Sequence, residues 1–366
     1  MMATNATAAT TGSRVCIRES NRCITSPRHK THRWLAVDWA TALEEIYQAF
    51  AIMKCMSSRK IVITGAAGLV GQNLLPRLKL RNLGEIVAID KHPANSAILR
   101  RFHPEIRLVT EDISKPGAWQ KEMEGCTHLV SAHAQIGGLH HEEFVCNNIT
   151  ATERLLEAAQ RSNVGYIINI SSSVVNSMAI DDYTETKKAQ EALIAASGIR
   201  QVVLRPTLMF GWFDRKHVGW LARFMQKVPV FPIPGDGKFL RQPLYAGDFA
   251  DIIASAIESE IVGAYNITGQ EQIDYIDLVR LVKQAVNARA RIQKIPYRMF
   301  WLLLRANALV DKNPPFTAKQ LQALVTPDVF EVIDWPGIFG VRATPLKKAL
   351  ESTFRDPIYS NVVLDF

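Results

Sequence analysis

The run Lys60-Ile-Val-Ile-Thr-Gly65-Ala-Ala-Gly68-Leu-Val-Gly71 decides the fold of this chain. Its first five residues are rich in β-branched side chains and predict a short buried strand, and apolar residues at helical spacing continue to Leu80. Gly65 permits a tight turn, Gly68 lets a ligand approach the backbone, and Gly71 lets the helix pack closely on the strand. The run therefore predicts a helix whose N-terminus faces the phosphates of a dinucleotide.

The next predicted strand, Glu85–Asp90, ends in an acid about twenty residues beyond the glycine turn. A carboxylate at this position can accept both ribose hydroxyls and would repel a 2′-phosphate. It therefore favours NAD over NADP, although the neighbouring Lys91 weakens the preference. We predict NAD as the cofactor. The residues expected to hold it in this part of the chain are Gly65, Gly68, Leu69, Val70, Gly71 and Asp90.

From residue 58 to residue 205, short apolar runs alternate with amphipathic stretches of helical spacing. The alternation is typical of βαβ units and predicts an α/β fold with a Rossmann-type, doubly wound parallel sheet. Several prolines follow Pro206, and they predict a small C-terminal substrate-binding lobe over 206–366, with residues 240–268 returning to the first domain. The predicted strands are Lys60–Thr64, Glu85–Asp90, Arg107–Thr110, His128–Ser131, Tyr166–Ser171 and Gln201–Arg205.

Residues 1–57 differ in texture from the rest of the chain. They hold seven Lys/Arg against four Asp/Glu, and their first half is rich in Ala, Thr, Ser and Arg. We expect an N-terminal extension that is disordered or partly helical and that the cofactor-binding domain does not need. A targeting presequence, or a true start at Met53 or Met56, is the alternative interpretation.

The bulk composition disfavours several classes of protein. The net charge is +8, but no basic run is interleaved with aromatic residues, so no nucleic-acid partner is expected. No window reaches the roughly 18 uninterrupted apolar residues of a spanning helix, so no integral membrane segment is expected. Five cysteines without CxxC spacing argue against zinc and disulfides and favour a cytoplasmic location. The histidines around His140 complete no metal-ligand spacing, and no metal is expected.

A tyrosine and a lysine four residues apart, Tyr183 and Lys187, share one face of a predicted helix. A cation beside the phenol would lower the pKa of Tyr183 and let it exchange a proton at neutral pH. Upstream, Ser172 lies in a serine cluster that ends a predicted strand, where a hydroxyl can orient a substrate oxygen. We predict Ser172, Tyr183 and Lys187 as the catalytic residues, with Lys187 also binding the cofactor.

Together these motifs resemble the extended short-chain dehydrogenase/reductases of the NAD-dependent epimerase/dehydratase group, from roughly Arg59 to Gly269. The resemblance implies further cofactor contacts. It aligns Asp112-Ile113 with an adenine-contacting pair and Asn148 with the Asn of an Asn-x-x-Gly-Thr helix. The further cofactor-binding residues that it implies are Asp112, Ile113, Ala134, Asn148 and Pro206.

For the substrate, the resemblance points to a nucleotide-sugar. Arg241 precedes Asp248 at the spacing of a family segment whose arginine often binds a nucleotide-sugar diphosphate. His133 follows a strand end expected beside the nicotinamide, and it is predicted to contact the substrate. Two departures leave the substrate open: Leu208 replaces a substrate-contacting Asn, and the loop between Ser172 and Tyr183 is short.

We therefore expect an enzyme that transiently oxidises a carbinol carbon of a nucleotide-sugar, as an epimerase or dehydrogenase, and that can form a homodimer. One alternative is a dehydrogenase or reductase of a non-nucleotide alcohol or ketone. Another is a non-catalytic NAD(P)-binding subunit, because the segment Phe316–Leu324 resembles relatives attached to respiratory complex I.

Two aromatic stretches outside these motifs have competing interpretations. The segment Trp212–Trp220 could contact a sugar or diphosphate, or its tryptophans could pack under the C-terminal lobe. The stretch Arg298–Val310 could lie on a membrane surface, but we expect its apolar face to pack within the lobe.

Overall fold

The computed structural model describes residues 59–178, 181–310, 321, 324–326 and 329–365. The predicted extension 1–57 lies outside the described residues, so its conformation and its dispensability stay predictions. Most of the segment Phe316–Leu324 lies outside them as well. Contacts divide the chain into one unit that ends at Ala49 and another that begins at Phe50, and every described residue belongs to the second unit.

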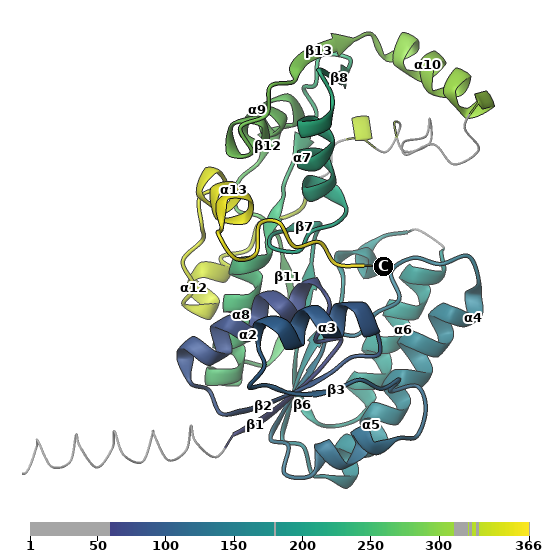
Figure 1. Cartoon of the computed structure of the whole chain (residues 1–366). Helices are drawn as coiled ribbons and strands as arrows, with labels where there is room; N and C mark the ends of the chain where they lie inside the picture. Colours follow the sequence, from purple (N-terminus) through teal and green to yellow (C-terminus); the bar gives the residue numbers. More distant parts are fainter. Residues whose placement is uncertain (1–58, 179–180, 311–320, 322–323, 327–328, 366) are drawn as a thin grey trace, which may run out of the picture. The chain divides into compact units, whose positions relative to one another are not determined.

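A seven-stranded sheet forms the centre of the described unit (Figure 1). Its order is β11-β6-β5-β4-β1-β2-β3, and every neighbouring pair is parallel. This confirms the predicted Rossmann-type doubly wound sheet, with each of the six predicted strands found to within a residue at either end. The strands are β1 Lys60–Thr64, β2 Glu85–Ile89, β3 Arg107–Val109, β4 His128–Ser131, β5 Tyr166–Ile170, β6 Arg200–Pro206 and β11 Gly263–Ile267.

Helices cover both faces of this sheet, as the alternating side chains of β1 show. Ile61 and Ile63 pack in a cluster with α2 and α8, whereas Val62 packs in a cluster with α5 and α6. A strand covered on both faces needs apolar residues at successive positions, which explains the unbroken run in β1. The helices are α2 Leu69–Arg81, α3 Pro93–Phe102, α4 His141–Phe144, α5 Ala151–Arg161, α6 Asp182–Ala196 and α8 Ala246–Ser259.

The strand order of the sheet reverses at β1. Strands β2 and β3 lie on one side of β1, and β4, β5, β6 and β11 lie on the other. Ligands of such sheets bind outside the carboxyl ends of the strands at this reversal. Thr64 and Ser131 pair in register where β1 and β4 end, so the glycine turn that follows Thr64 borders the expected crevice.

The lobe has its own core, built from short strand pairs and helices. Strands β8 and β13 pair in parallel, and Phe231 and Ile233 of β8 pack with Val279 and Val282 of α9. Its elements are β7 Met209–Phe210, α7 His217–Lys227, β8 Val230–Pro234, β9 Leu240–Arg241, β10 Leu244–Tyr245, β12 Ile273–Asp274, α9 Tyr275–Ala285, β13 Arg291–Ile295, α10 Tyr297–Val310, α12 Trp335–Phe339 and α13 Leu346–Arg355. Between them, α8 and β11 return to the central sheet.

Helix α10 departs from the expectation of a buried apolar face. The large side chains Met299, Trp301, Leu302 and Leu303 are all exposed. None of the three core clusters found among the described residues includes a side chain of α10. Within the described ranges, no helix combines the length and the hydropathy that crossing a bilayer requires.

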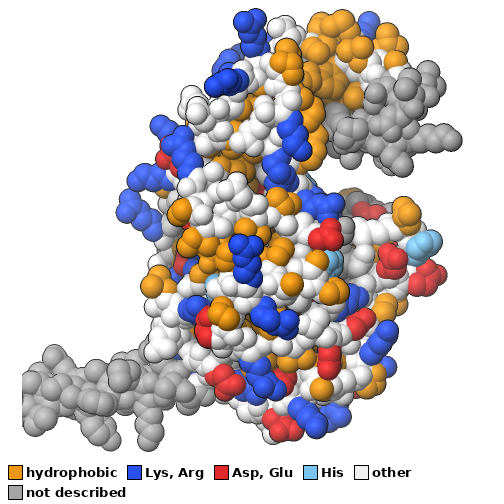
Figure 2. All heavy atoms as spheres, in the orientation of Figure 1, with side chains coloured by type: hydrophobic (Ala, Val, Ile, Leu, Met, Phe, Trp, Pro, Cys, Tyr) orange, Lys and Arg blue, Asp and Glu red, His pale blue; other side chains and the backbone are white. Residues whose placement is uncertain are grey.

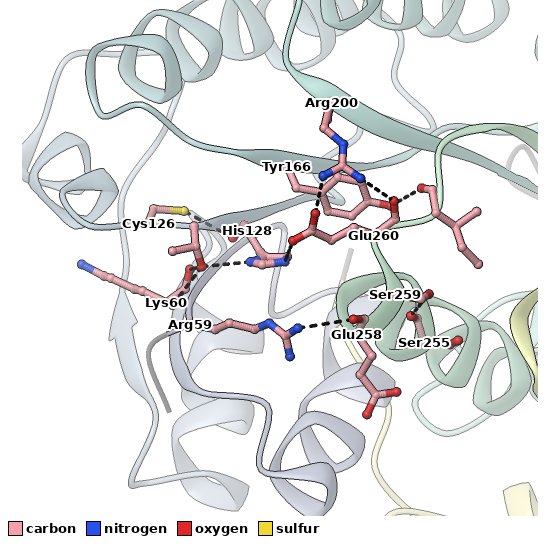
Figure 3. A network of polar contacts seen from close by, with 12 residues as sticks. Arg59, Lys60, Cys126, His128, Tyr166, Arg200, Ser255, Glu258, Ser259 and Glu260 are labelled. Carbon is pink, nitrogen blue, oxygen red and sulfur yellow. Dashed lines mark hydrogen bonds and ion pairs between the residues drawn. The ribbon is translucent and has the colours of Figure 1, made fainter. Parts of the chain in front are cut away.

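A polar network fastens the turn between α8 and β11 to the amino ends of the sheet strands (Figure 3). Glu260 takes a left-handed conformation that ends α8, with φ 49°. Its carboxylate accepts a hydrogen bond from Arg200 of β6 at 2.5 Å and lies 3.4 Å from His128 Nε2 of β4. The hydroxyl of Tyr166 in β5 donates to the carbonyl of Ile261. The network thus links three strands to the turn that brings β11 back.

Burial lowers the pKa of His128 below its ordinary value. The folded chain therefore keeps His128 neutral where the unfolded chain takes up a proton, so stability should fall as the pH drops below about 6.5. His128→Phe keeps the aromatic contact with Tyr166, whose ring centroid lies 5.8 Å away. When the pH falls from about 7.5 to about 5.5, the unfolding free energy of the wild type should decrease by up to about 1.4 kcal/mol more than that of this variant.

Urea unfolding at both pH values measures this difference. The exposed His140 provides the control, because His140→Phe should follow the wild type at both pH values. Equal losses in the wild type and His128→Phe would show that His128 does not contribute to the pH dependence.

Candidate functional site

The turn between β1 and α2 depends on glycine at two positions. Gly65 has φ +66°, and a Cβ there would lie 2.7 Å from the carbonyl oxygen of Ala132. A Cβ on Gly71 would collide with the backbone of Ala66. Near Gly68 the closest atom is the carbonyl oxygen of Gly65, at 3.2 Å. The turn therefore packs tightly against its neighbours but leaves the backbone at Gly68 open to approach.

Asp90 follows β2 and bonds to the glycine turn. One carboxylate oxygen accepts the backbone N–H of Ala67 at 2.9 Å, and the other accepts that of His92 at 2.8 Å. Burial raises the pKa of Asp90, and these two hydrogen bonds act in the opposite direction. Each oxygen retains a lone pair, so the carboxylate can accept further hydrogen bonds from a ribose.

The start of α2 is suited to an anion. Its N-cap, Gly68, offers no side-chain hydrogen bond, and its first turn holds no acidic residue. The amides of this turn are therefore available to an external acceptor at the positive end of the helix dipole. Leu69 and Val70 lie half-buried in the same turn. These residues fit the predicted NAD: the amides would bind its pyrophosphate, and Asp90 would bind a ribose.

Asp112 and Ile113 follow β3, and β3 pairs with β2, the strand that Asp90 follows. Asp112 accepts the backbone N–H and the hydroxyl of Ser114 at 3.0 and 2.7 Å, and it lies 3.5 Å from the ammonium of Lys91. The pKa of Asp112 is lowered: burial raises it, but the bonds to Ser114 and the Lys91 charge outweigh burial. Ile113 is buried. Asp112 and Ile113 thus lie beyond the carboxyl end of β3, on the same side of β1 as Asp90.

A π-helical turn, Val145–Thr150, turns Asn148 into the protein just before α5. The Asn148 side chain is fully buried, accepts the N–H of Gln135 at 2.7 Å and donates to its carbonyl at 3.2 Å. It also donates to Thr186 of α6 at 2.9 Å. Asn148 therefore joins the segment after β4 to the helix of the predicted catalytic pair. Ala134 in that segment is exposed, whereas Pro206 at the end of β6 is buried.

His133 is directed into the protein between β1, α5 and α6. Its Nδ1 lies 2.8 Å from the hydroxyl of Thr64, and its Nε2 lies 3.1 Å from that of Thr152 and 3.3 Å from the amide of Gln190. Desolvation, aided by the charge of Lys187, lowers the pKa of His133 to about 3. His133 is therefore neutral at physiological pH, and these contacts give no support to its predicted role in substrate binding.

Lys187 is fully buried behind β5. Its ammonium donates to the carbonyl of Ile170 at 2.9 Å and to the side chain of Gln190. Desolvation lowers the pKa of Lys187 to about 7, and the charge of Glu191 acts against this. Lys187 is therefore poised between its charged and neutral forms near neutral pH.

Tyr183 and Ser172 meet at the end of β5. Burial raises the pKa of Tyr183, and the neighbouring Ser172 side chain acts in the opposite direction without outweighing burial. The direction is opposite to the expectation that Lys187 lowers this pKa. Lys187 is not among the groups that act on the phenol, because its ammonium is bound to Ile170 and Gln190.

Several buried polar atoms near the carboxyl ends of β5 and β6 have no hydrogen-bond partner among the described residues. They include the hydroxyl oxygens of Ser171 and Thr207 and the amide of Asn169. Because a buried polar group without a partner costs free energy, such a cluster is typical of a site that a ligand or water completes.

Arg241 lies in β9 of the lobe. Its guanidinium donates to the carbonyls of Leu240 and Thr326, each at 2.8 Å, and packs over the ring of Phe239 at 5.1 Å. Asp248, at the other end of the motif, accepts hydrogen bonds from the backbone N–H and the hydroxyl of Thr344. Arg241 and Asp248 are therefore held by different parts of the lobe.

Asp248 also lines a cavity of about 100 Å³ beneath α13. Trp335, Thr344 and Leu346 contribute to its wall, and burial raises the pKa of Asp248 to about 6. None of the predicted catalytic or cofactor-binding residues lines this cavity. Among the described residues, no cluster of His, Cys, Asp and Glu could hold a metal ion.

The aromatic segment that begins at Trp212 packs under the C-terminal part of the chain. The indole of Trp212 donates to the carbonyl of Ser352 at 3.0 Å and lies 4.8 Å from the ring of Tyr359. Arg215 pairs with Asp365 at 3.1 Å. These contacts favour the packing interpretation over a sugar contact.

The sequence reasoning missed the polar residues that hold the predicted site in place. Gln190 binds both Lys187 and Thr152, and Thr186 binds Asn148. Both lie on α6 within three residues of Lys187, on turns that the motif itself predicts to be helical. Polar residues on the buried face of a helix were the available signal, since such residues need partners.

Relatives of known activity are distant in sequence. A ceramide reductase of Caulobacter vibrioides is 22% identical over 258 residues, which cover 69% of this chain and 77% of that protein. UDP-glucuronic acid decarboxylase 4 of Arabidopsis thaliana is 21% identical over 65% of this chain, and the match spans only 59% of the plant protein.

Solved structures share the fold. UDP-glucuronic acid 4-epimerase of Bacillus cereus, in complex with NAD, matches with a TM-score of 0.60 and 22% identity over 80% of this chain and 94% of that one. UDP-N-acetylglucosamine 4-epimerase of Methanobrevibacter ruminantium, in complex with UDP-N-acetylmuramic acid, gives 0.64 and 16% over 81% and 96%. These matches confirm the fold class.

A family model matches residues 61–268, from the first strand to the residue after β11. This span is more than half of the chain, and it includes the glycine turn, Asp90 and the helix of Tyr183 and Lys187. It bears out the resemblance and agrees with the prediction of NAD as the cofactor. With the sheet topology and the site geometry in agreement, the chain belongs to the NAD dependent epimerase/dehydratase family.

Proposed function

We propose that this protein is an NAD-dependent epimerase/dehydratase-type enzyme that transiently oxidises a carbinol carbon of a nucleotide-sugar. The observation that carries the proposal is the Ser172 side chain beside the Tyr183 phenol, with Lys187 one helical turn beyond Tyr183. A phenol and a hydroxyl that meet at the carboxyl edge of a parallel sheet can bind the same substrate oxygen.

In this proposal Tyr183 takes the hydroxyl proton while Ser172 donates a hydrogen bond to the same oxygen. When bound, NAD supplies a hydride acceptor and, in its oxidised form, a positive charge. A positive charge close to the buried phenol would lower the pKa of Tyr183, which burial alone raises. Lys187, with its pKa of about 7, can give up or accept a proton on the inner side of the site.

Arg241 supports the choice of a nucleotide-sugar. Its guanidinium is held in β9 by two carbonyl groups, and a planar guanidinium can bind phosphate oxygens in bidentate fashion. Distant relatives and solved structures of the same fold act on or bind UDP-sugars. A homodimer and a cytoplasmic location stay predictions.

A non-nucleotide alcohol or ketone is the second candidate substrate. The relative from Caulobacter is a ceramide reductase. Leu208 is exposed where a polar substrate contact was expected, and Ile136, Leu139 and Met178 are also exposed in the segments that follow β4 and β5. An apolar substrate would suit such side chains. The Tyr183–Ser172 pair disfavours the third alternative, a non-catalytic subunit, which has no need of it.

Replacing Tyr183 with Phe should abolish turnover while it preserves the fold. The variant lacks the proton acceptor, so the rate should fall by about 10²- to 10⁴-fold. Chromatography of a panel of UDP-sugars after incubation with enzyme and NAD measures the product. Tyr265→Phe, which removes a hydroxyl bound to the carbonyl of Val262, is the control and should turn over like the wild type. An active Tyr183→Phe enzyme would refute the assignment.

Asp90→Ala should weaken NAD binding by about ten- to a hundredfold, because two ribose hydroxyls lose a charged acceptor. NADP should gain relative to NAD, since the charge that opposes a 2′-phosphate is gone. Calorimetric titration with both nucleotides tests this, and Asp277→Ala on the exposed face of α9 is the control. A wild type that prefers NADP, or a preference that Asp90→Ala leaves intact, would contradict the prediction.

Arg241→Ala should weaken the binding of UDP and UDP-sugars by about ten- to a hundredfold, because the diphosphate loses a charged hydrogen bond. NAD affinity should stay the same, because the glycine turn and Asp90 belong to a different part of the chain. Arg280→Ala, which breaks an exposed ion pair on α9, is the matched control in the same titrations. If the wild type binds NAD but no UDP compound, the nucleotide-sugar proposal fails and the second candidate replaces it.

A further inference from the structure

Helix α10 carries a large apolar surface that the described chain does not cover. Its 14 residues include six large apolar or aromatic side chains in succession, from Met299 to Leu304, and Tyr297 lies two positions before them. Leu302 is 62% exposed, Leu303 55% and Met299 49%. Figure 2 shows hydrophobic side chains gathered at this helix, which follows β13 at the far end of the lobe from the sheet (Figure 1).

The other helices of the lobe behave differently. Helices α7, α9 and α13 each bury an apolar face in the lobe core, through residues such as Leu221, Val279 and Leu350. Helix α10 contributes to no such cluster among the described residues. The lobe core is therefore complete without it, and the apolar surface of α10 is not needed to close that core.

The charge around α10 has a single sign. Residues 278–310 contain seven Lys/Arg and no Asp or Glu. Arg289, Arg291, Lys294, Arg298 and Arg305 are exposed, and none of them forms an ion pair with a described carboxylate. The five exposed basic side chains attract anions, and the exposed leucines beside them favour a partner that is both anionic and apolar.

The side chains of α10 are those of helices that lie at a membrane interface. Tyr297 and Trp301 have an apolar body and a polar group, which suits the boundary between headgroups and acyl chains. Arg305 packs over the Trp301 ring at 5.2 Å, so its charged end lies beside apolar surface. With 14 residues the helix is about 21 Å long, too short to cross the hydrocarbon core of about 30 Å.

We infer that α10 attaches the protein to the surface of an anionic lipid bilayer. The leucines, Met299 and Trp301 enter the acyl boundary, and the arginines and Lys294 contact the anionic headgroups. A nucleic acid would satisfy the charges but leave the leucines in water. An uncharged protein groove would bury the leucines but not use the charges. The inference is independent of the proposed function, because it concerns a surface that includes none of the catalytic or cofactor-binding residues.

The test is flotation of the full-length protein with vesicles of phosphatidylcholine, with and without about a quarter of phosphatidylglycerol. The wild type should float with the anionic vesicles, bind the neutral ones at least about tenfold more weakly, and detach in about 0.5 M salt. Leu302→Glu/Leu303→Glu should lower binding to the anionic vesicles by at least about tenfold.

Matched variants separate the helix from general effects. Leu80→Glu/Val262→Glu adds the same charge at two other exposed apolar positions, 87% and 54% exposed, and should float like the wild type. Arg298→Gln/Arg305→Gln should weaken binding to anionic vesicles, whereas Lys347→Gln/Lys348→Gln on exposed positions of α13 should not. Thermal unfolding and NAD binding of each variant serve as checks on the fold.

Three results would overturn the inference. The first is a wild type that floats with neither kind of vesicle. The second is a Leu302→Glu/Leu303→Glu variant that folds and floats like the wild type. The third is a wild type that does not float but forms a dimer in sedimentation, which the same variant dissociates. That outcome would assign α10 to contact between two copies of the chain.

Discussion

The close approach of α2 to β1 is the constraint on which the rest of the structure depends. It exists because Gly71 has no side chain against Ala66 and because Gly65 bends away at positive φ beside Ala132. The same approach aims an uncapped helix N-terminus at the crevice and places Ala67 where Asp90 can bind it. The predicted cofactor preference and the backbone packing thus depend on one local geometry.

A second layer of organisation lies behind the site. His133, Thr152 and Gln190 connect β4, α5 and α6, and Gln190 also holds Lys187. Asn148 adds a further bond from the π-helical turn to α6. The helix of the predicted catalytic pair is therefore positioned by buried polar contacts as well as by apolar packing. Buried networks of this kind fix a geometry because each member needs its partner.

The parts that could be predicted from the sequence are those with a local cause. Strands β1 to β6 and the glycine turn follow from short-range patterns of apolar residues and glycine. Strand β11 was missed because Gly263-Ala-Tyr-Asn-Ile267 is weakly apolar, and it becomes a strand by pairing with β6. The orientation of His133 and the direction of the Tyr183 pKa shift depend on contacts between distant segments, which spacing does not encode. Helix α10 is exposed because the core of the lobe is formed by other elements, and this arrangement also depends on contacts between distant segments.

The position of β11 at the edge of the sheet has a consequence for the order of events during synthesis. Its partner β6 leaves the ribosome before residues 207–262, so β6 waits as an open edge until that intervening segment has been made. Unpaired apolar edges recruit other chains, and long-range pairing forms slowly. The ion pair of Arg200 and Glu260 joins the first residue of β6 to the turn before β11, so it holds the start of β11 beside the start of the edge that it covers.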